Sequence, residues 1–193
     1  MFVSRLMACC VVAGLATFAS DGLAAESSHL SIATFQIDAT PPIGSPLCNA
    51  AVSPVKEILD PLSARGIVLL GSGRPIVLCA VDWVGIANGG YDAWRSALAE
   101  AAGTSIDRVA VHTLHQHDAP GCDFEAEEIL AARGLSGSMF HVKFARETIE
   151  RAAVACRESL KHSSPLTHIG LGRAKVDRVA STRRPLGPDG KVK

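Results

Sequence analysis

The chain has 193 residues, of which 48% are hydrophobic, and its 19 basic and 19 acidic residues give a formal net charge of zero. This length is enough for one domain with its own hydrophobic core. The balanced charge lacks the basic footprint of nucleic-acid-binding proteins, so we expect no nucleic-acid partner.

The first 25 residues are typical of a signal peptide. Arg5 provides a positive n-region, residues 6–19 form an apolar h-region, and small residues at 22–25 offer a cleavage site. We therefore predict a signal peptide at residues 1–25 and a mature domain at residues 26–193. The protein is expected to be exported, to the periplasm, the cell surface or the extracellular space.

Four cysteines remain after the predicted cleavage: Cys48, Cys79, Cys122 and Cys156. An oxidising compartment permits disulfides among them, and the sequence leaves their connectivity open. Cys79 and Cys156 lie in apolar patterns, so buried free thiols are an equally good interpretation for these two.

Apolar runs separated by Gly and Pro predict an alternation of strands and helices. The predicted strands cover residues 30–37, 65–70, 76–81, 109–115, 167–172 and 175–180. The predicted helices cover residues 91–102 and 140–160, the second with Ser138 as its N-cap. This order predicts an α/β fold, a layered mixed β-sheet with flanking helices.

A polar cluster follows the apolar run at residues 109–111. His115 and His117 are two residues apart, so in an extended chain they point to the same side. Two such histidines at a strand end are half of a zinc site, and a surface loop is the alternative. Asp82 also follows a predicted strand, and ligands of such sheets gather beyond the strand carboxyl ends.

Two further segments are irregular. Residues 123–138 form an acidic, glycine-punctuated excursion, a candidate lid with a short helical turn at residues 125–132. Residues 185–190 predict a tight turn, and residues 191–193 begin a returning strand. Because a domain rarely ends in half a hairpin, we expect the N-terminal part of a longer protein.

Residues 115–121, His-Gln-His-Asp-Ala-Pro-Gly, resemble the Thr-His-Thr-His-Ser-Gly-Pro-Gly motif of the neutral/alkaline ceramidase family. Four other segments resemble family landmarks in the same order: residues 38–44, 65–82, 140–160 and 170–185. The sequence departs from the family beside both histidines. Leu114 and Gln116 replace threonines, Asp118-Ala119 replaces Ser-Gly, and Thr182 stands where Asn is usual.

The resemblance implies the N-terminal portion of a larger ceramidase-like catalytic domain, truncated at its C-terminal end. By this resemblance His115 is a Zn²⁺ ligand, His117 lies in the active centre, and Arg183 steadies negative charge on the substrate oxygen. The implied activity is zinc-dependent hydrolysis of amide bonds in N-acyl lipids, with a ceramide-like substrate and membrane contact through that substrate. The implied remaining zinc ligands come from sequence beyond residue 193.

Two other classes compete with this interpretation. An exported binding or surface protein could retain the fold without catalysis, because fold does not establish activity. The metallo-β-lactamase pattern places x-Asp-His after His-x-His. Here Asp118 follows His117 directly, so that spacing fails.

Overall fold

The computed structural model of the chain describes residues 30–177 and 184–192. The predicted signal peptide, Arg183 and residues 178–180 of the last predicted strand therefore lie outside the described residues.

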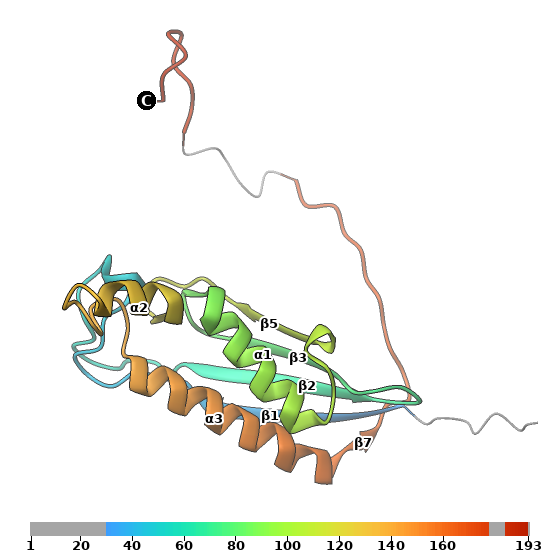
Figure 1. Cartoon of the computed structure of the whole chain (residues 1–193). Helices are drawn as coiled ribbons and strands as arrows, with labels where there is room; N and C mark the ends of the chain where they lie inside the picture. The colour runs from blue at the N-terminus through green and yellow to red at the C-terminus, as the bar shows by residue number, and fades with distance from the viewer. Residues whose placement is uncertain (1–29, 178–183, 193) are drawn as a thin grey trace, which may run out of the picture.

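A five-stranded mixed sheet forms the centre of the fold (Figure 1). Its strands are β1 (Ser31–Asp38), β2 (Ser63–Leu70), β3 (Ile76–Val81), β5 (Val109–Thr113) and β7 (Ser164–Pro165). They lie in the order β5-β3-β2-β1-β7, with β3 and β5 parallel and the other neighbours antiparallel. The predicted α/β class with a layered mixed sheet is confirmed.

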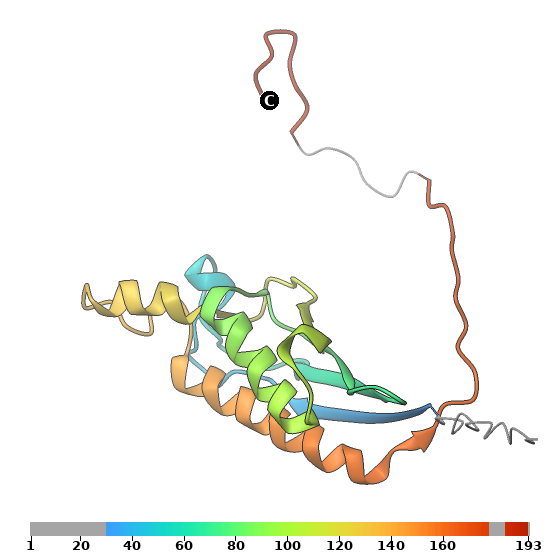
Figure 2. The same ribbon diagram turned by 45° about the vertical axis from the view of Figure 1, so that its right-hand side comes forward.

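Two long helices cover one face of this sheet (Figures 1 and 2). They are α1 (Asn88–Ala102) and α3 (Val142–Ser159). Period-two alternation explains which face they cover, because Val77, Cys79 and Val81 of β3 are buried while Ile76 and Leu78 stay exposed. The fold therefore has two layers within the described residues.

Aromatic side chains join the two layers. The Trp83 and Trp94 rings meet edge to face, with centroids 5.7 Å apart, and both side chains are fully buried. Trp83 also packs on Phe144 of α3, and its indole N–H donates to the carbonyl of Ala39 over 2.9 Å. This cluster fixes the end of β3 against both helices.

The remaining elements are short. They are β4 (Gly85–Ile86), β6 (Gly121–Cys122), α2 (Phe124–Ala131) and three 3-10 turns at Cys48–Ala50, Ile106–Arg108 and Leu160–His162. β4 and β6 pair in parallel as a separate two-stranded sheet. Among the described residues, no helix is both long and apolar enough to span a bilayer.

The predicted strand at residues 167–172 is wrong, and residues 175–177 of the next one are not in a strand either. The chain pairs with β1 only at Ser164 and Pro165, whose partners are Ile32 and Ser31. Since β1 begins at Ser31, the antiparallel chain then runs past its end and finds no further strand to pair with among the described residues. Residues 166–177 leave the sheet as extended, largely exposed chain (Figure 2).

The predicted N-cap of the second long helix is also wrong. α3 begins at Val142, and its N-cap is His141, whose Nδ1 accepts the backbone N–H of Phe144 over 3.1 Å. Ser138 lies too far upstream to reach the first free N–H groups of this helix. The predicted turn at residues 185–190 is confirmed, because Leu186 and Val192 form an antiparallel bridge across it.

All four described cysteines are free, so no disulfide forms among them. Cys79, Cys122 and Cys156 are buried, which confirms the buried-thiol interpretation for Cys79 and Cys156. Burial raises the pKa of the Cys79 thiol to about 12 and that of Cys156 to about 11. Both thiols are therefore protonated side chains of the core at neutral pH.

Candidate functional site

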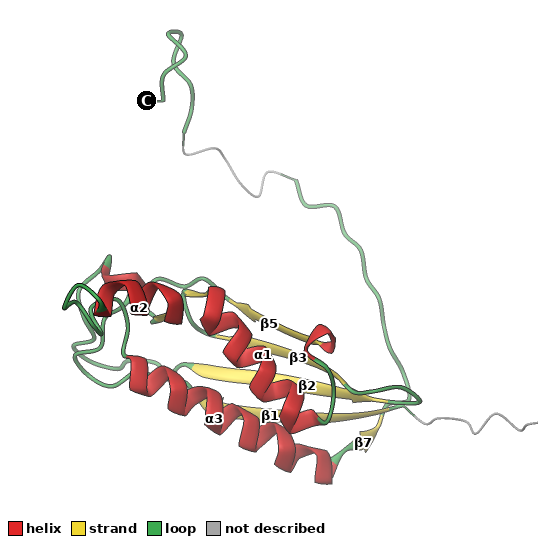
Figure 3. Ribbon diagram, in the orientation of Figure 1, coloured by secondary structure: helices red, strands yellow, loops and turns green. Residues whose placement is uncertain are grey.

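The carboxyl ends of three strands lie at the same end of the sheet. β1 and β3 are both antiparallel to β2, and β5 is parallel to β3, so all three run in the same direction. The loops that follow them gather with α2 at one end of the molecule, on the left of Figure 3. Asp82 follows β3, and the histidine loop (residues 114–120) follows β5. The two meet there as the sequence predicted, since Gln116 donates to the Asp82 carbonyl.

His115 has a strained backbone and a fixed ring. Its φ is +58°, in the left-handed region that non-glycine residues rarely adopt. Its backbone N–H donates to the carbonyl of Trp83 over 3.2 Å, and its Nδ1 lies 2.7 Å from the carbonyl oxygen of Val84. A carbonyl can only accept, so in the neutral imidazole Nδ1 carries the proton and Nε2 keeps its lone pair.

His117 lies beside His115, with ring centroids 5.2 Å apart and planes at 81°. Both side chains are exposed. The structure therefore brings together the two histidines that the sequence singled out. The free Nε2 of His115 fits the predicted metal ligand, and the His117 imidazole lies beside it.

The described residues do not complete a zinc shell. Within residues 30–177 and 184–192, no three His, Cys, Asp or Glu side chains gather closely enough to hold a metal ion. Catalytic zinc needs three protein ligands, so the two histidines fit only part of such a site.

A left-handed turn supports the histidine loop from outside the sheet. Cys48, Asn49 and Ala50 have φ values of +47°, +55° and +66°, and the Cys48 N–H donates to the carbonyl of Ala119 over 2.8 Å. A Cβ at Gly121 would overlap the Asn49 side chain, so any larger residue there would have to displace Asn49. Sequence reasoning missed this turn, because none of its residues commonly signals three consecutive left-handed conformations.

The histidine loop borders a cleft of about 710 Å³. Leu114, Gln116 and Asp118 form one wall, and residues 53–60 form much of another. Gln116 holds its own loop in place, since its Nε2 donates to the carbonyl of Asp82 and its Oε1 accepts the backbone N–H of Asp118. His115 and His117 alternate with these residues and do not line the cleft.

Within the histidine loop, residues that resemble the ceramidase-family motif alternate with residues that differ from it. His115 and His117 resemble the motif, whereas Leu114, Gln116 and Asp118 depart from it and line the cleft. Ala119, which also departs, is buried and does not line the cleft. Residues 53–60 lack any periodic pattern, so sequence reasoning gave no reason to expect them as a wall.

The predicted short helix beside the site is confirmed as α2, which projects from the same end of the molecule (Figure 2). Its N-cap is Asp123, whose Oδ1 accepts the Ala126 N–H over 3.1 Å. The other carboxylate oxygen of Asp123 accepts the Asn88 amide over 2.7 Å. Asp123 thus ties the start of α1 to the start of α2.

Cys122 lies next to Asp123 but has no nucleophilic character. Burial and the neighbouring Asp123 charge raise the pKa of the Cys122 thiol to about 12, against a smaller lowering by Arg146. Since the thiolate is the reactive form, this cysteine is inert at neutral pH.

The chain was compared with known protein families, curated proteins and solved structures. No protein-family model and no curated protein matches the chain. A neutral ceramidase from Pseudomonas aeruginosa is similar in structure, with a TM-score of 0.51 at 14% identity, over 72% of this chain and 23% of that one. A structure described as ceramidase complexed with C2 aligns with a TM-score of 0.49 at 17% identity, over 72% and 22% of the two chains. The first likeness shows a ceramidase-like fold, and the chain spans about a quarter of that protein's length.

Proposed function

We propose that this chain contributes the histidine loop of an exported, zinc-dependent hydrolase that cleaves amide bonds in N-acyl lipids. The observation that carries the proposal is the 2.7 Å contact between Nδ1 of His115 and the carbonyl oxygen of Val84. This contact fixes the ring orientation and leaves the lone pair of Nε2 free to bind a metal, the usual arrangement of a zinc-ligating histidine. The ceramidase-like fold supports the choice of reaction.

The roles of the site residues follow from this arrangement. His115 binds the metal through Nε2, and His117, whose ring is 5.2 Å away, binds or orients the reacting water. Zinc supplies Lewis-acid activation of water for attack on an amide carbonyl. Arg183, outside the described residues, is proposed from the resemblance to steady negative charge on the substrate oxygen.

We also propose the domain organisation and location that the sequence predicts. Residues 1–25 are a signal peptide, and residues 26–193 are the N-terminal part of a ceramidase-like catalytic domain. The other zinc ligands are proposed to come from outside the described residues. A ceramide-like lipid amide is the proposed substrate, reached at a membrane surface.

Zinc uptake tests the central claim directly. Elemental analysis and zinc titration of His115→Ala should show zinc affinity lowered by about tenfold or more. His162→Ala is the matched control, because His162 is an exposed histidine on the turn after α3. Equal zinc affinity in wild-type protein and His115→Ala would overturn the assignment. Release of fatty acid from an N-acyl lipid by the zinc-loaded longer protein tests the reaction itself.

One observation favours a second candidate, the exported binding protein without catalysis. The cleft beside the histidine loop is lined by residues other than His115 and His117. A ligand could therefore be held there without reaching either imidazole. Ligand binding with no amide hydrolysis by the zinc-loaded longer protein would favour this candidate over the enzyme.

A further inference from the structure

Asn88, the first residue of α1, is one of two asparagines in the sequence; the other is Asn49. Both are exposed, and both have a left-handed backbone, with φ values of +46° for Asn88 and +55° for Asn49. They differ in the residue that follows, which is Gly89 after Asn88 and Ala50 after Asn49. Glycine has no Cβ, so its backbone nitrogen can approach the preceding side chain without obstruction.

The backbone nitrogen of Gly89 is not engaged by the helix. The N-cap of α1 is Ala87, which has no side-chain acceptor. The N–H groups of Gly90 and Tyr91 donate to the Ala87 carbonyl, but within the described residues no acceptor takes the Gly89 N–H. The first N–H groups of a helix lack partners within it, so this nitrogen is free to react with the Asn88 side chain.

The side-chain amide of Asn88 binds the residue that caps α2. Nδ2 of Asn88 donates to Oδ2 of Asp123 over 2.7 Å, while Oδ1 of Asp123 accepts the Ala126 N–H. The exposed fraction of Asp123 is only 9%, and α2 lies beside the first turn of α1 (Figure 3). A chemical change of the Asn88 amide therefore acts directly on the cap of α2.

We propose that Asn88 is a deamidation site, and that its conversion to an acid releases α2 from α1. The hydrogen bond to Asp123 opens first, as helix ends fray. The Gly89 nitrogen then bonds to Cγ of Asn88 and gives up its proton, and the amide nitrogen leaves with that proton as ammonia. One water molecule opens the resulting succinimide ring to aspartate or isoaspartate. This reaction needs no zinc and no lipid, so it is independent of the proposed hydrolysis.

Either product places a carboxylate where an amide had donated a hydrogen bond to Asp123. The dipole of α1 favours a negative charge in its first turn. The Asp123 carboxylate lies within hydrogen-bond distance and is shielded from water, however, so repulsion between the two charges dominates. Isoaspartate also lengthens the main chain by one carbon, two residues before Gly90. That glycine packs tightly on Cys122, since a Cβ there would lie 2.5 Å from the Cys122 carbonyl oxygen.

Incubation of the purified protein in mild alkali, followed by peptide mass spectrometry, tests the modification. Asn88 should be deamidated about tenfold or more faster than Asn49, because only Asn88 precedes a glycine. Gly89→Ala is the matched control, since a Cβ there would meet Cγ of Glu125 at an ordinary 3.5 Å. Asn88 should react about tenfold more slowly in this variant. An intact Asn88, equal rates at the two asparagines, or an unchanged rate in Gly89→Ala would overturn the proposal.

Two variants of Asn88 separate the added charge from the lost hydrogen bond. Asn88→Asp reproduces the product, and it should raise amide hydrogen exchange in α2 about tenfold or more. Asn88→Gly removes the hydrogen bond without adding a charge and tolerates the left-handed backbone, so it should raise this exchange about threefold or less. Exchange of β1 and β2 amides should stay near the wild-type rate in both variants. Equal exchange of α2 in the two variants, wild-type exchange in Asn88→Asp, or acceleration throughout the sheet would contradict the release of α2.

Discussion

One carboxylate oxygen of Asp82 accepts hydrogen bonds from both the backbone N–H and the hydroxyl of Ser63, each over 2.8 Å. The Asp82 N–H donates in return to the Ser63 carbonyl over 2.9 Å. Ser63 begins β2 and Asp82 follows β3, so these bonds close the sheet edge that carries the candidate site. They also fix the Asp82 carboxylate at the wall of the cleft.

Ser63→Ala should lower the free energy of unfolding by about 1–2 kcal/mol, because Ser63 is buried and its hydroxyl donates to a charged group. Urea unfolding measures this change. Ser72→Ala is the control, since Ser72 lies exposed in the turn between β2 and β3, and its effect should stay within about 0.5 kcal/mol. Similar losses in both variants would show that the Ser63 hydroxyl contributes no specific bond.

A second prediction concerns Gly66 and Phe35, which face each other across β1 and β2. A Cβ at Gly66 would overlap the Phe35 ring, which lies over the glycine in the core. Gly66→Ala should therefore destabilise the fold by about 1–3 kcal/mol, as overpacking does. Gly73→Ala, in an open turn, should change stability much less.

Urea unfolding of a double variant, Gly66→Ala with Phe35→Leu, distinguishes overpacking from lost strand pairing. If the ring is the obstacle, Phe35→Leu should cost less stability in the Gly66→Ala background than in the wild type. Additive losses would show that the alanine is tolerated sterically and that the Phe35 ring is not what excludes it.

Much of the sheet was predictable because its strands alternate or run apolar between clear breakers. β3 occupies Ile76–Val81, the range that the sequence predicts, since Pro75 and Asp82 bound an uninterrupted apolar run. The predicted strand at residues 167–172 failed for a reason that no local pattern contains. Its alternation is real, but strand formation needs a partner edge, and β1 ends its pairing at Ser31.

The candidate site was also predictable only in part. The spacing of His115 and His117 predicted neighbouring side chains, and their rings do lie together. The predicted reason was wrong, because β5 ends at Thr113 and His115 is left-handed and not extended. The cleft was not predictable, because its wall at residues 53–60 has no regular structure of its own and is positioned by tertiary packing. The cap of α3 was missed because His141 is an uncommon N-cap residue, although its Nδ1 accepts a backbone N–H as Ser or Asp oxygens do.

The buried thiol of Cys79 predicts a loss of stability in alkali. Burial, with a smaller effect of Cys156, raises its pKa to about 12, against 9.0 for an unperturbed thiol. A folded-state pKa above the unfolded value means that this stabilisation is complete below pH 9 and declines as the pH rises toward 12. Between pH 7 and pH 10 the wild type should lose about 1 kcal/mol through this group.

Comparison with Cys79→Ala isolates that contribution. The variant should be less stable at pH 7, because it leaves a small cavity, but its free energy of unfolding should fall less between pH 7 and pH 10. Urea titrations at the two pH values measure both quantities. Parallel losses in the two proteins would contradict the assignment to Cys79.

The last prediction concerns the segment after α2, which a buried carboxylate holds in place. The exposed fraction of Glu127 is only 7%, and its two oxygens accept the Ser136 hydroxyl and the Gly137 N–H, the latter over 2.9 and 3.1 Å. These bonds fold residues 132–138 back onto α2 at the end of the molecule that carries the candidate site. Glu127 is therefore the residue on which the order of this segment depends.

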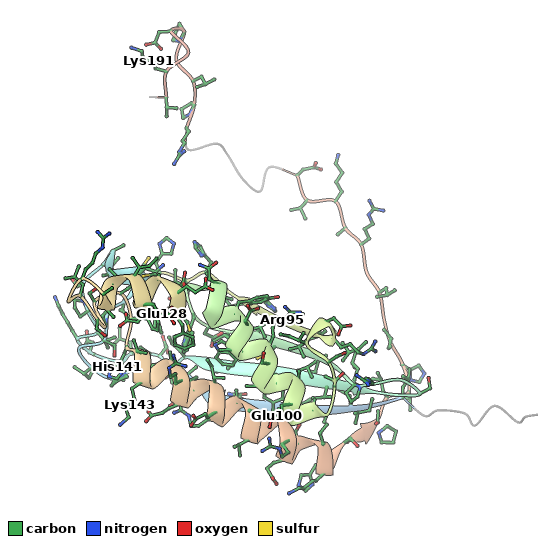
Figure 4. The ribbon with its side chains drawn as sticks, in the orientation of Figure 1. Arg95, Glu100, Glu128, His141, Lys143 and Lys191 are labelled. Atoms are coloured by element: carbon green, nitrogen blue, oxygen red, sulfur yellow. The ribbon has the colours of Figure 1, made fainter. Side chains whose placement is uncertain are left out.

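Glu127→Ala should raise amide hydrogen exchange in residues 132–138 by about tenfold or more, because the loop loses a buried charged acceptor. Glu127→Gln keeps one acceptor oxygen and should give an intermediate rate. Glu128→Ala is the matched control, since Glu128 is the exposed neighbour on the same helix (Figure 4). The exchange of β2 and β3 amides should stay near the wild-type rate in all three variants, because the sheet does not rest on this segment. Equal acceleration in Glu127→Ala and Glu128→Ala would mean that the segment is ordered by something other than the Glu127 carboxylate.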